Sequence, residues 1–246
     1  MPEHYFAERI ALVTGGSGGI GAALSLRLAS AGATVGVHYA SDRDSAERVV
    51  AAVAAHGGAA ASFAADLRDP DAPERLVNAV EAELGPVDIL AANAGLSRQA
   101  RYEDVDAAAF DETVAVNLRA PYLLARRVLP AMRAHGYGRI LFTSSVAALT
   151  GGIVGPHYAS SKAGLHGLTH FLASRVARDG VTVNAIAPAL IEETGMLPGD
   201  PGDLAQRVPV GRLGKPGEVA DLAMAILRNG YVTNQVISVD GGMHPG

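Results

Sequence analysis

The sequence predicts a doubly wound α/β fold, with a seven-stranded parallel sheet and helices on both faces. Short β-branched or aliphatic runs alternate with longer Ala-rich amphipathic stretches, a pattern typical of repeated βα units. No linker rich in Pro, Gly or Ser separates two regions of different composition. The chain has 246 residues, of which 49% are hydrophobic, enough to fill one large core. We therefore expect residues 1–246 to form a single domain.

The elements follow from the two periodicities of the sequence. Strands are expected at the short apolar runs: residues 9–14, 33–39, 60–65, 87–92, 138–144, 181–187 and 235–239. Helices are expected in the intervals: residues 19–30, 44–56, 72–84, 112–135, 157–178 and 217–229. Residues 189–216 are the least regular stretch, because Pro and Gly interrupt both periodicities. Loops at the carboxyl edge of such a sheet bind ligands, so we expect this segment to be a substrate lid.

Composition excludes several classes of protein. The formal net charge is -5 with both signs interspersed, so no basic stripe is available for nucleic acid. The absence of cysteine excludes disulfides and thiolate metal sites, and we expect no metal. The N-terminus lacks a signal-peptide pattern, and no apolar run approaches the roughly 18 residues that span a bilayer. We expect a cytoplasmic protein that does not enter the membrane.

A glycine-rich turn, TGGSGGIG at residues 14–21, joins the first strand to the first helix. Missing side chains let a pyrophosphate approach the backbone N–H groups and the positive end of the helix. The spacing TGxxxGxG differs from GxGxxG, so tight packing is an alternative explanation. The same letters also contain GxSxG, the nucleophile elbow of hydrolases. That reading is disfavoured, because no strand precedes this one to build a hydrolase sheet and no HGGG-type loop follows.

Tyr158 and Lys162 lie one helical turn apart, on the same face of a predicted helix. A tyrosine has a pKa of about 10, and a nearby ammonium stabilises the phenolate that acid/base catalysis needs. A surface aromatic beside a solvated charge is the alternative. Ser145 strengthens the catalytic interpretation, because a hydroxyl at a strand end can donate to a substrate oxygen. Ser144 turns to the opposite face of the strand, so only one of the two serines can serve.

Taken together, these residues resemble the short-chain dehydrogenase/reductase family over essentially the whole chain. The matching motifs are TGGSGGIG, Asp66 in ADL, NAG at 93–95, Asn117 in VNL, Ser145, Tyr158-x-x-x-Lys162, Pro188 and VDGG at 239–242. The resemblance implies a Rossmann-type domain and a redox reaction between a nicotinamide nucleotide and a carbonyl/alcohol pair. It also implies a homo-oligomer, a tetramer or dimer, for which the helices at 112–135 and 157–178 are candidate interfaces.

The family assigns roles to the matching positions. Tyr158 would exchange the proton with the carbonyl oxygen and Ser145 would polarise that carbonyl. Lys162 would lower the tyrosine pKa and hold the ribose, and Asn117 would hold a water-linked relay to Lys162. The implied cofactor-binding residues are Gly15, Ser17, Gly18, Gly19, Ile20, Gly21, Tyr39, Ala40, Ser41, Arg43, Asp66, Leu67, Asn93, Ala94, Gly95, Tyr158, Lys162, Pro188, Ile191 and Thr194. Structural roles stay open for Asn117, which could bridge a helix bulge, and for Asp66, which could cap a turn.

The choice of cofactor depends on the end of the second strand. An acid there would bind the ribose hydroxyls and repel a 2′-phosphate, but this chain has Tyr39, Ala40 and Ser41, followed by Arg43. We therefore expect NADP(H) in preference to NAD(H). Asp42 and Asp44 weaken the positive field, and Gly18 stands where many NADP-preferring relatives carry a basic residue.

The substrate is the least determined feature. VPVGRLGKPGEVA resembles bacterial 3-oxoacyl-acyl-carrier-protein reductases, which present basic residues where this chain has Gly136 and Asp179. Arg133, Arg175 and Arg178 are close enough in sequence to substitute, or are solvated surface charges. Ala189 replaces a usual glycine, and the longer segment before Thr194 makes its match less secure. We expect an NADPH-dependent carbonyl reductase acting on a small molecule, with 3-oxoacyl thioesters as candidates. The alternatives are an alcohol, sugar or steroid-type dehydrogenase and a catalytically silent nucleotide sensor.

Overall fold

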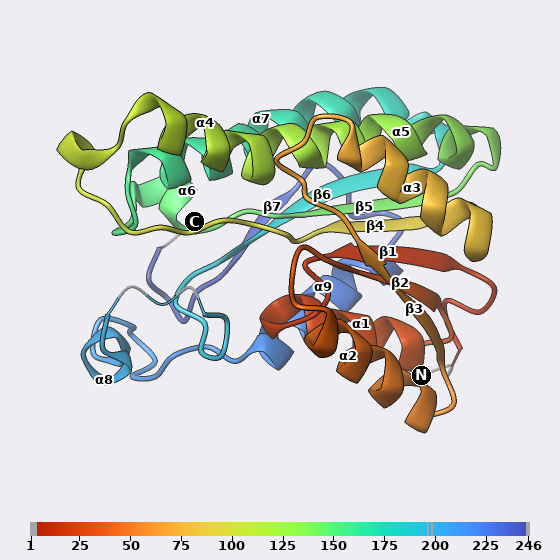
Figure 1. The fold of residues 1–246 in the computed structure, drawn as a ribbon, viewed down its shortest axis with the longest axis horizontal. Helices are drawn as coiled ribbons and strands as arrows, with labels where there is room; N and C mark the ends of the chain where they lie inside the picture. Colours follow the sequence, from red (N-terminus) through yellow and green to blue (C-terminus); the bar gives the residue numbers. More distant parts are fainter. Residues whose placement is uncertain (1–3, 196, 198, 245–246) are drawn as a thin grey trace.

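The computed structural model describes residues 4–195, 197 and 199–244. Seven strands form one parallel sheet in the order β3-β2-β1-β4-β5-β6-β7, which confirms the predicted fold class (Figure 1). The strands are β1 Ile10–Thr14, β2 Thr34–Tyr39, β3 Ala59–Ala64, β4 Ile89–Ala92, β5 Gly138–Thr143, β6 Val181–Pro188 and β7 Val236–Val239. Each lies within about two residues of its expected range, because buried parallel strands are marked by continuous apolar runs.

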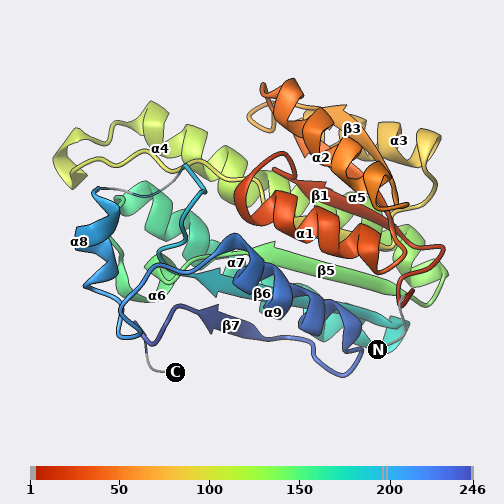
Figure 2. The same ribbon diagram turned by 90° about the horizontal axis from the view of Figure 1, so that it is seen from below.

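Helices cover both faces of the sheet. On one face lie α1 Gly19–Ser30, α2 Arg43–Ala55 and α9 Pro216–Arg228, as the view from below makes clear (Figure 2). On the other face lie α3 Ala72–Glu83, α4 Ala107–Val114, α5 Ala120–Ala134 and α7 Pro156–Val176 (Figure 1). Neighbouring residues of β1 pack into different hydrophobic cores. Leu12 lies in the core between the sheet and α3, α5 and α7, and Val13 lies in the core between the sheet and α1 and α9. This follows from the alternation of side chains along a strand.

The order of the strands reverses beside β1. The chain runs from β1 outward to β2 and β3, then returns to place β4 on the other side of β1. In open parallel sheets, the crevice at such a reversal, outside the carboxyl ends of the strands, is where ligands bind. The glycine-rich turn leaves β1 at this position.

The helix expected at 112–135 starts earlier than predicted and is not regular. It begins at Ala107, where Asp106 accepts a hydrogen bond of 2.8 Å from the backbone N–H of Ala109 and so caps the first turn. A π-helical turn at Ala115–Arg119 then joins α4 to α5. Such a turn inserts one extra residue into the helix and is frequent at functional sites.

Two short helices and two 3₁₀ turns were not expected. They are α6 Ala147–Thr150, α8 Pro201–Ala205, and the turns Tyr102–Asp104 and Ala177–Asp179. Helix α8 lies within the irregular segment 189–216, of which Met196 and Pro198 are outside the described residues. Asp200 caps α8 by accepting from the backbone N–H groups of Gly202 and Asp203. Pro201 occupies the first helical position, which suits its fixed φ.

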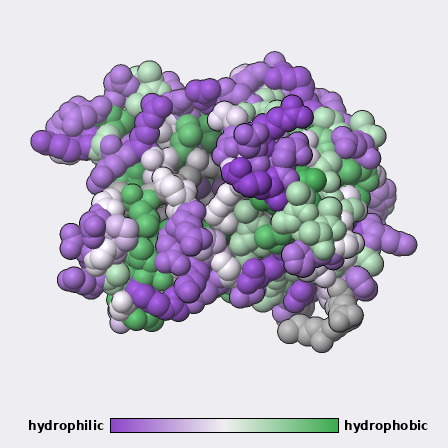
Figure 3. Space-filling view, turned by 60° about the horizontal axis from the view of Figure 1, so that its bottom comes forward, coloured by the Kyte–Doolittle hydropathy of each residue, from purple (hydrophilic) through white to green (hydrophobic). Residues whose placement is uncertain are grey.

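On the face shown in Figure 3, hydrophilic residues surround bands of apolar residues that lie beside a hollow. Within the described part of the chain, no helix is long and apolar enough to cross a bilayer. The same residues contain no group of three or more His, Cys, Asp or Glu side chains arranged to hold a metal ion.

Candidate active site

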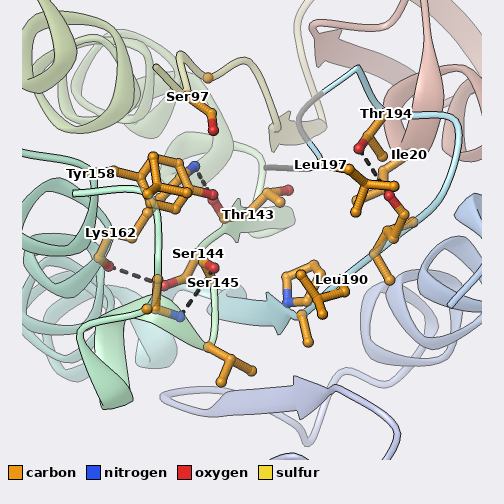
Figure 4. A pocket seen from close by; sticks show the side chains of 18 of the residues that line it. Ile20, Ser97, Thr143, Ser144, Ser145, Tyr158, Lys162, Leu190, Thr194 and Leu197 are labelled. Atoms are coloured by element: carbon orange, nitrogen blue, oxygen red, sulfur yellow. Dashed lines mark hydrogen bonds between the residues drawn. The ribbon is translucent and has the colours of Figure 1, made fainter. Parts of the chain in front are cut away.

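A cavity of about 590 Å³ opens at the carboxyl ends of the central strands. Its walls come from the glycine-rich turn, the ends of β4 and β5, the first turns of α7 and the segment that follows β6. Figure 4 shows Tyr158, Lys162, Ser144 and Ser145 on one side of it and Ile20 and Thr194 on the other. This volume lies within the range of small-molecule and cofactor sites.

The glycine-rich turn needs its glycines for steric reasons. Gly15 has a φ of +61°, and a Cβ at Gly21 would lie 2.0 Å from the Gly15 carbonyl oxygen. No ordinary Cβ tolerates that distance, so α1 can approach the turn only because position 21 lacks a side chain. Helix α1 begins at Gly19, and among the described residues no side chain caps its N-terminus. The first backbone N–H groups of α1 therefore face the cavity side without a side-chain acceptor.

His38 holds this turn from the end of β2. The Gly15 N–H donates to His38 Nδ1 at 3.0 Å, so the ring proton lies on Nε2, which is 3.0 Å from the Ala65 carbonyl oxygen. Burial lowers the pKa of this imidazole, and the hydrogen bond with Ala65 only partly opposes that effect. His38 is therefore a neutral link between the glycine-rich turn and the residue that follows β3.

Thr14 and Asn93 join β1 to β4 at the cavity floor. The Thr14 hydroxyl accepts hydrogen bonds from the backbone N–H groups of Asn93 and Ala94, at 3.0 and 3.1 Å. The Asn93 amide donates to the Gly15 carbonyl oxygen at 3.3 Å. The NAG motif and the glycine-rich turn are thus fixed to each other by hydrogen bonds.

The two serines at the end of β5 have different partners. Ser144 donates to the Lys162 carbonyl oxygen at 3.0 Å and lies 2.8 Å from His166 Nε2, so its hydroxyl is engaged with α7. Ser145 accepts from the Ala147 N–H at 3.1 Å, and its hydroxyl is near enough to the Tyr158 phenol to lower the pKa of that phenol. Ser145 is thus the serine on the tyrosine side of the cavity.

Burial dominates the electrostatics of Tyr158, and the lowering of its pKa by Lys162 that the resemblance implies stays a prediction. Tyr158 is 9% exposed, and burial raises the pKa of its phenol, while the nearby Ser145 hydroxyl only partly offsets that rise. The Lys162 ammonium lies 5.7 Å from the centre of the Tyr158 ring and donates to the Thr143 carbonyl oxygen at 2.7 Å. Burial lowers the pKa of Lys162 to about 8. Desolvation disfavours the charged form of both groups.

Asn117 lies behind the cavity, in the π-helical turn, and is fully buried. Its amide oxygen accepts from the Leu96 N–H at 2.7 Å. Its amide nitrogen donates to the Leu96 carbonyl oxygen at 3.0 Å and to the Ser161 hydroxyl at 3.1 Å. The side chain therefore joins the segment after β4 to α7, a positioning contact. The water-linked relay implied by the resemblance stays a prediction.

Comparison with known proteins agrees with this fold and site. The sequence profile of the family described as short chain dehydrogenase matches residues 9–201. The chain belongs to the short-chain dehydrogenase/reductase family. It is 36% identical to an acetoacetyl-CoA reductase of Allochromatium vinosum over 242 residues, covering 96% of this chain and 98% of that protein. It is 35% identical to a 3-oxoacyl-[acyl-carrier-protein] reductase of Synechocystis over 240 residues, covering 96% of each chain.

Solved structures give the same result. A doubly substituted variant of a Serratia marcescens short-chain dehydrogenase/reductase superposes with a TM-score of 0.91 at 33% identity, covering 98% of this chain and 99% of that one. A dehydrogenase/reductase from Sinorhizobium meliloti superposes with a TM-score of 0.89 at 35% identity, covering 98% and 96%. The chain is accordingly an NAD(P)-dependent oxidoreductase that acts on a carbonyl/alcohol pair.

Most of the predicted site residues of this dehydrogenase/reductase line this cavity. They are Gly15, Ser17, Gly18, Gly19, Ile20, Asn93, Ala94, Gly95, Ser145, Tyr158, Lys162, Pro188, Ile191 and Thr194. Thr194, whose match was insecure, lies against the glycine-rich turn: a Cβ at Gly19 would be 3.3 Å from Thr194 Cα and Cγ2. Gly21, Tyr39, Ala40, Ser41, Arg43, Asp66, Leu67 and Asn117 are outside the cavity lining.

The residues predicted for the adenosine end lie at the neighbouring ends of β2 and β3. Ala65 donates its N–H to the Tyr39 carbonyl oxygen at 3.0 Å, so these two strand ends are adjacent. The Asp66 carboxylate binds the Arg68 guanidinium at 2.6 Å and accepts from the Arg68 N–H at 3.0 Å. These bonds lower the pKa of Asp66 and place its carboxylate in a turn, while its implied contact with the adenine stays a prediction.

Several cavity residues were not predicted from the sequence. Ser97, Thr150, Ile153, Val154, Leu197, Arg207 and Met243 also line it. Val154 reaches the cavity through a contact between two loops. Its carbonyl oxygen accepts from the Ala100 N–H at 2.9 Å, and this bond joins the segment after β4 to the loop before α7. Except for Thr150 at the end of α6, these residues lie outside helices and strands, and none belongs to a motif, so only the folded chain reveals them.

Proposed function

We propose that this dehydrogenase/reductase uses NADPH to reduce a ketone, with Tyr158 as the proton donor. The observation that carries the proposal is that Ser145, Tyr158 and Lys162 line the same cavity as the glycine-rich turn. A hydride donor and a proton donor must lie side by side for such a reduction, and one cavity offers space for both.

The residues present fit a dinucleotide. Helix α1 presents an N-terminus without a side-chain cap in the described structure, and a Cβ at Gly18 would meet no atom within 4 Å. A pyrophosphate can therefore approach the backbone N–H groups closely there. Ser17 to Ile20 and Asn93 to Gly95 would hold the cofactor together with Pro188, Ile191 and Thr194. When bound, its nicotinamide supplies the hydride.

The preference for NADP(H) is supported by the start of α2. Both Asp42 oxygens accept hydrogen bonds from Ser45, one from the backbone N–H at 3.0 Å and one from the hydroxyl. The Asp42 carboxylate is thus turned toward the helix it caps, away from a ligand role. Arg43 is exposed and lies 3.7 Å from Glu47, an exposed pair of low strength that a phosphate can displace. Tyr39, Ala40 and Ser41 add no acidic group.

The side chains at the reacting end have complementary tasks. Ser145 accepts from the Ala147 N–H, which leaves its own hydrogen available for a substrate oxygen. A phenol with a raised pKa keeps its proton at neutral pH, so Tyr158 holds the proton that the reduced carbonyl oxygen takes up. The Lys162 ammonium, held by the Thr143 carbonyl oxygen, stabilises the phenolate left behind.

We further propose a 3-oxoacyl thioester as the substrate, since relatives are named acetoacetyl-CoA reductase and 3-oxoacyl-[acyl-carrier-protein] reductase. Arg133 is paired with Asp179 at 2.6 Å, and Arg175 lies 3.6 Å from the centre of the Phe171 ring. Two of the three arginines that could grip an acidic carrier protein are thus already engaged. We therefore favour coenzyme A over a carrier protein as the acyl carrier.

Other expectations stay proposals. Residues 189–216 would act as a lid within a single domain, and Thr194 already lies against the glycine-rich turn. A dimer or tetramer would use α5 and α7, on which Tyr122 and Phe171 are exposed. A cytoplasmic location accords with substrates of this kind.

The test is consumption of NADPH with acetoacetyl-CoA and a panel of simple ketones, by the wild type and by Tyr158→Phe. We expect turnover that falls by about a hundredfold or more in the variant, the usual size of a lost general acid. Turnover that Tyr158→Phe leaves unchanged would contradict the mechanism. Tight cofactor binding without turnover of any compound would favour a nucleotide sensor. Thermal stabilisation by NADH greater than by NADPH at equal concentration would reverse the cofactor preference.

A further inference from the structure

The cavity is poor in charge. Among its described lining residues only Lys162 and Arg207 carry charged side chains, and no carboxylate is present. Lys162 is 3% exposed and binds the Thr143 carbonyl oxygen, so its ammonium is already engaged. Arg207 is exposed and is the cation that an incoming substrate can meet.

Arg207 is held in place by its neighbours. Leu204 and Val208 are buried, and the Arg207 N–H donates to the Leu204 carbonyl oxygen at 3.1 Å. The stretch is fixed against the chain after β7, because the Val210 N–H donates to the Gly241 carbonyl oxygen at 3.2 Å. A Cβ at Gly241 would lie 2.6 Å from Val208, so the two segments are in close contact. The backbone of Arg207 is thus positioned, while its guanidinium is free to move.

The guanidinium has no partner in the part of the chain that the structure describes. Neither an ion pair nor a hydrogen bond involves it, although Asp203 lies one helical turn earlier. By contrast, nearby Arg212 binds Glu218 at 2.6 Å. An arginine left unpaired over a cavity without carboxylates creates a field that attracts anions.

We propose that Arg207 binds an anionic group of the carbonyl substrate, a carboxylate or a phosphate, and selects such compounds over neutral ketones. This inference rests on the proposed reductase function and adds the substrate class to it. The planar fork of a guanidinium suits either anion through paired hydrogen bonds. Apolar Ile153, Leu190 and Leu197 line the same cavity and suit the carbon chain of the substrate.

The experiment uses two matched pairs of substrates. Acetoacetate and methyl acetoacetate differ in a carboxylate, and the acetoacetyl thioesters of phosphopantetheine and of pantetheine differ in a phosphate. Kinetics with NADPH and with NADH are measured for the wild type, Arg207→Ala and Arg207→Lys. Arg75→Ala is the charge control, because Arg75 on α3 is also exposed and is absent from the cavity lining.

We expect Arg207→Ala to raise KM for the anionic member of one pair about ten- to hundredfold, the range of a lost charge-assisted hydrogen bond, with little change in kcat. KM for the neutral member should stay close to the wild-type value. Arg207→Lys should recover part of the loss, and Arg75→Ala should behave as the wild type. If Arg207→Ala raises KM only for acetoacetate, the anionic group that Arg207 binds is a carboxylate. If it raises KM only for the phosphorylated thioester, that group is a phosphate.

Equal changes for neutral and anionic members, or no change in either pair, would overturn the inference. Thermal stabilisation by the same four compounds in the presence of NADP⁺ is read in parallel, because it does not require turnover. No turnover by the wild type would refute the proposed reductase. Absence of an anion preference that depends on Arg207, in binding as well as kinetics, would refute the role of Arg207 alone.

Discussion

Replacement of Lys162 by Met tests the consequence of burying an ammonium in the core of the site. Methionine has a similar length and lacks the charge, so the substitution removes the desolvated group and keeps the packing. Because Lys162 would also stabilise the phenolate of Tyr158, we expect the variant to lose activity. Its stability should nevertheless not fall, which separates the catalytic consequence of the charge from its thermodynamic one.

The magnitude follows from the pKa of Lys162, which burial lowers from 10.5 to about 8. This difference corresponds to about 3 kcal/mol of unfavourable free energy for holding the ammonium in the folded state at pH 7. The Met variant avoids it, but leaves the Thr143 carbonyl oxygen without its 2.7 Å donor, which costs about 1–3 kcal/mol. We therefore expect the variant to be between about equally stable and about 2 kcal/mol more stable at pH 7.

The pH dependence gives a sharper signature. Between pH 8 and 10.5 the unfolded state holds a proton on Lys162 that the folded state has released, so stability of the wild type rises with pH there. Relative to Lys162→Met, the free energy of unfolding of the wild type should therefore rise by about 2–3 kcal/mol between pH 7 and pH 10. Urea unfolding of both proteins at several pH values measures this difference. The contributions of all other titrating groups are common to both proteins and cancel in the comparison.

The matched control is Lys215→Met, which removes the other lysine of the chain, an exposed one. The pH-dependent stability difference measured with Lys162→Met should exceed the one measured with Lys215→Met, because only Lys162 is buried. Parallel stability profiles for wild type and Lys162→Met would refute the reasoning. A free energy of unfolding that is lower in the Met variant by more than about 2 kcal/mol at pH 7 would also refute it, because the buried ammonium would then stabilise the fold rather than destabilise it.

The remaining two predictions concern the glycine-rich turn. Gly21→Ala should lower the free energy of unfolding by about 2–4 kcal/mol and weaken NADP⁺ binding, because its Cβ would lie 2.0 Å from the Gly15 carbonyl oxygen. Gly167→Ala in α7 is the control: its Cβ would meet no atom within 4 Å, so the substitution should be neutral or stabilising by up to about 1 kcal/mol. Urea unfolding measures the stability of both variants, and fluorescence titration measures their NADP⁺ binding. Equal losses of stability in the two variants would contradict the steric argument. Acidification below about pH 6.5 should destabilise the wild type. In the unfolded state His38 takes up a proton in this range, whereas in the folded state burial lowers its pKa and keeps the ring neutral, so protons favour the unfolded state. His38→Asn should flatten this part of the pH–stability profile measured by thermal unfolding, and a profile identical to the wild type would exclude His38 as the cause.

The sequence was informative where the chemistry is local. Tyr158 and Lys162 are one turn apart on α7 and Ser145 follows β5, so spacing and strand ends were enough to bring them together. The glycine-rich turn was recognisable for the same reason. Asn234 has a φ of +66°, and Asn tolerates the left-handed region better than most residues.

The sequence was uninformative where contacts are distant. Arg207 and Met243 enter the cavity because the chain after α8 lies against the chain after β7, a contact between segments about 30 residues apart. Burial by the assembled fold raises the pKa of Tyr158, an effect that the spacing between Tyr158 and Lys162 does not reveal. Burial depends on every element packed around a group, which no local spacing encodes. Helix α8 was missed because its Pro and Gly content conceals a cap at Asp200.

The motif residues of this site are held by residues outside the motifs, and mostly through the backbone. His38 fixes the Gly15 N–H, Ser144 binds the Lys162 carbonyl oxygen, and Lys162 in turn binds the Thr143 carbonyl oxygen. Each bond joins a catalytic or cofactor segment to a neighbouring strand or helix, so displacing one segment alters the geometry of the next. A chain could therefore carry every motif letter and still misplace Tyr158 by the fraction of an ångström that matters for proton transfer. Function in this fold is consequently a property of the packed strand ends as much as of the four residues that the motifs identify.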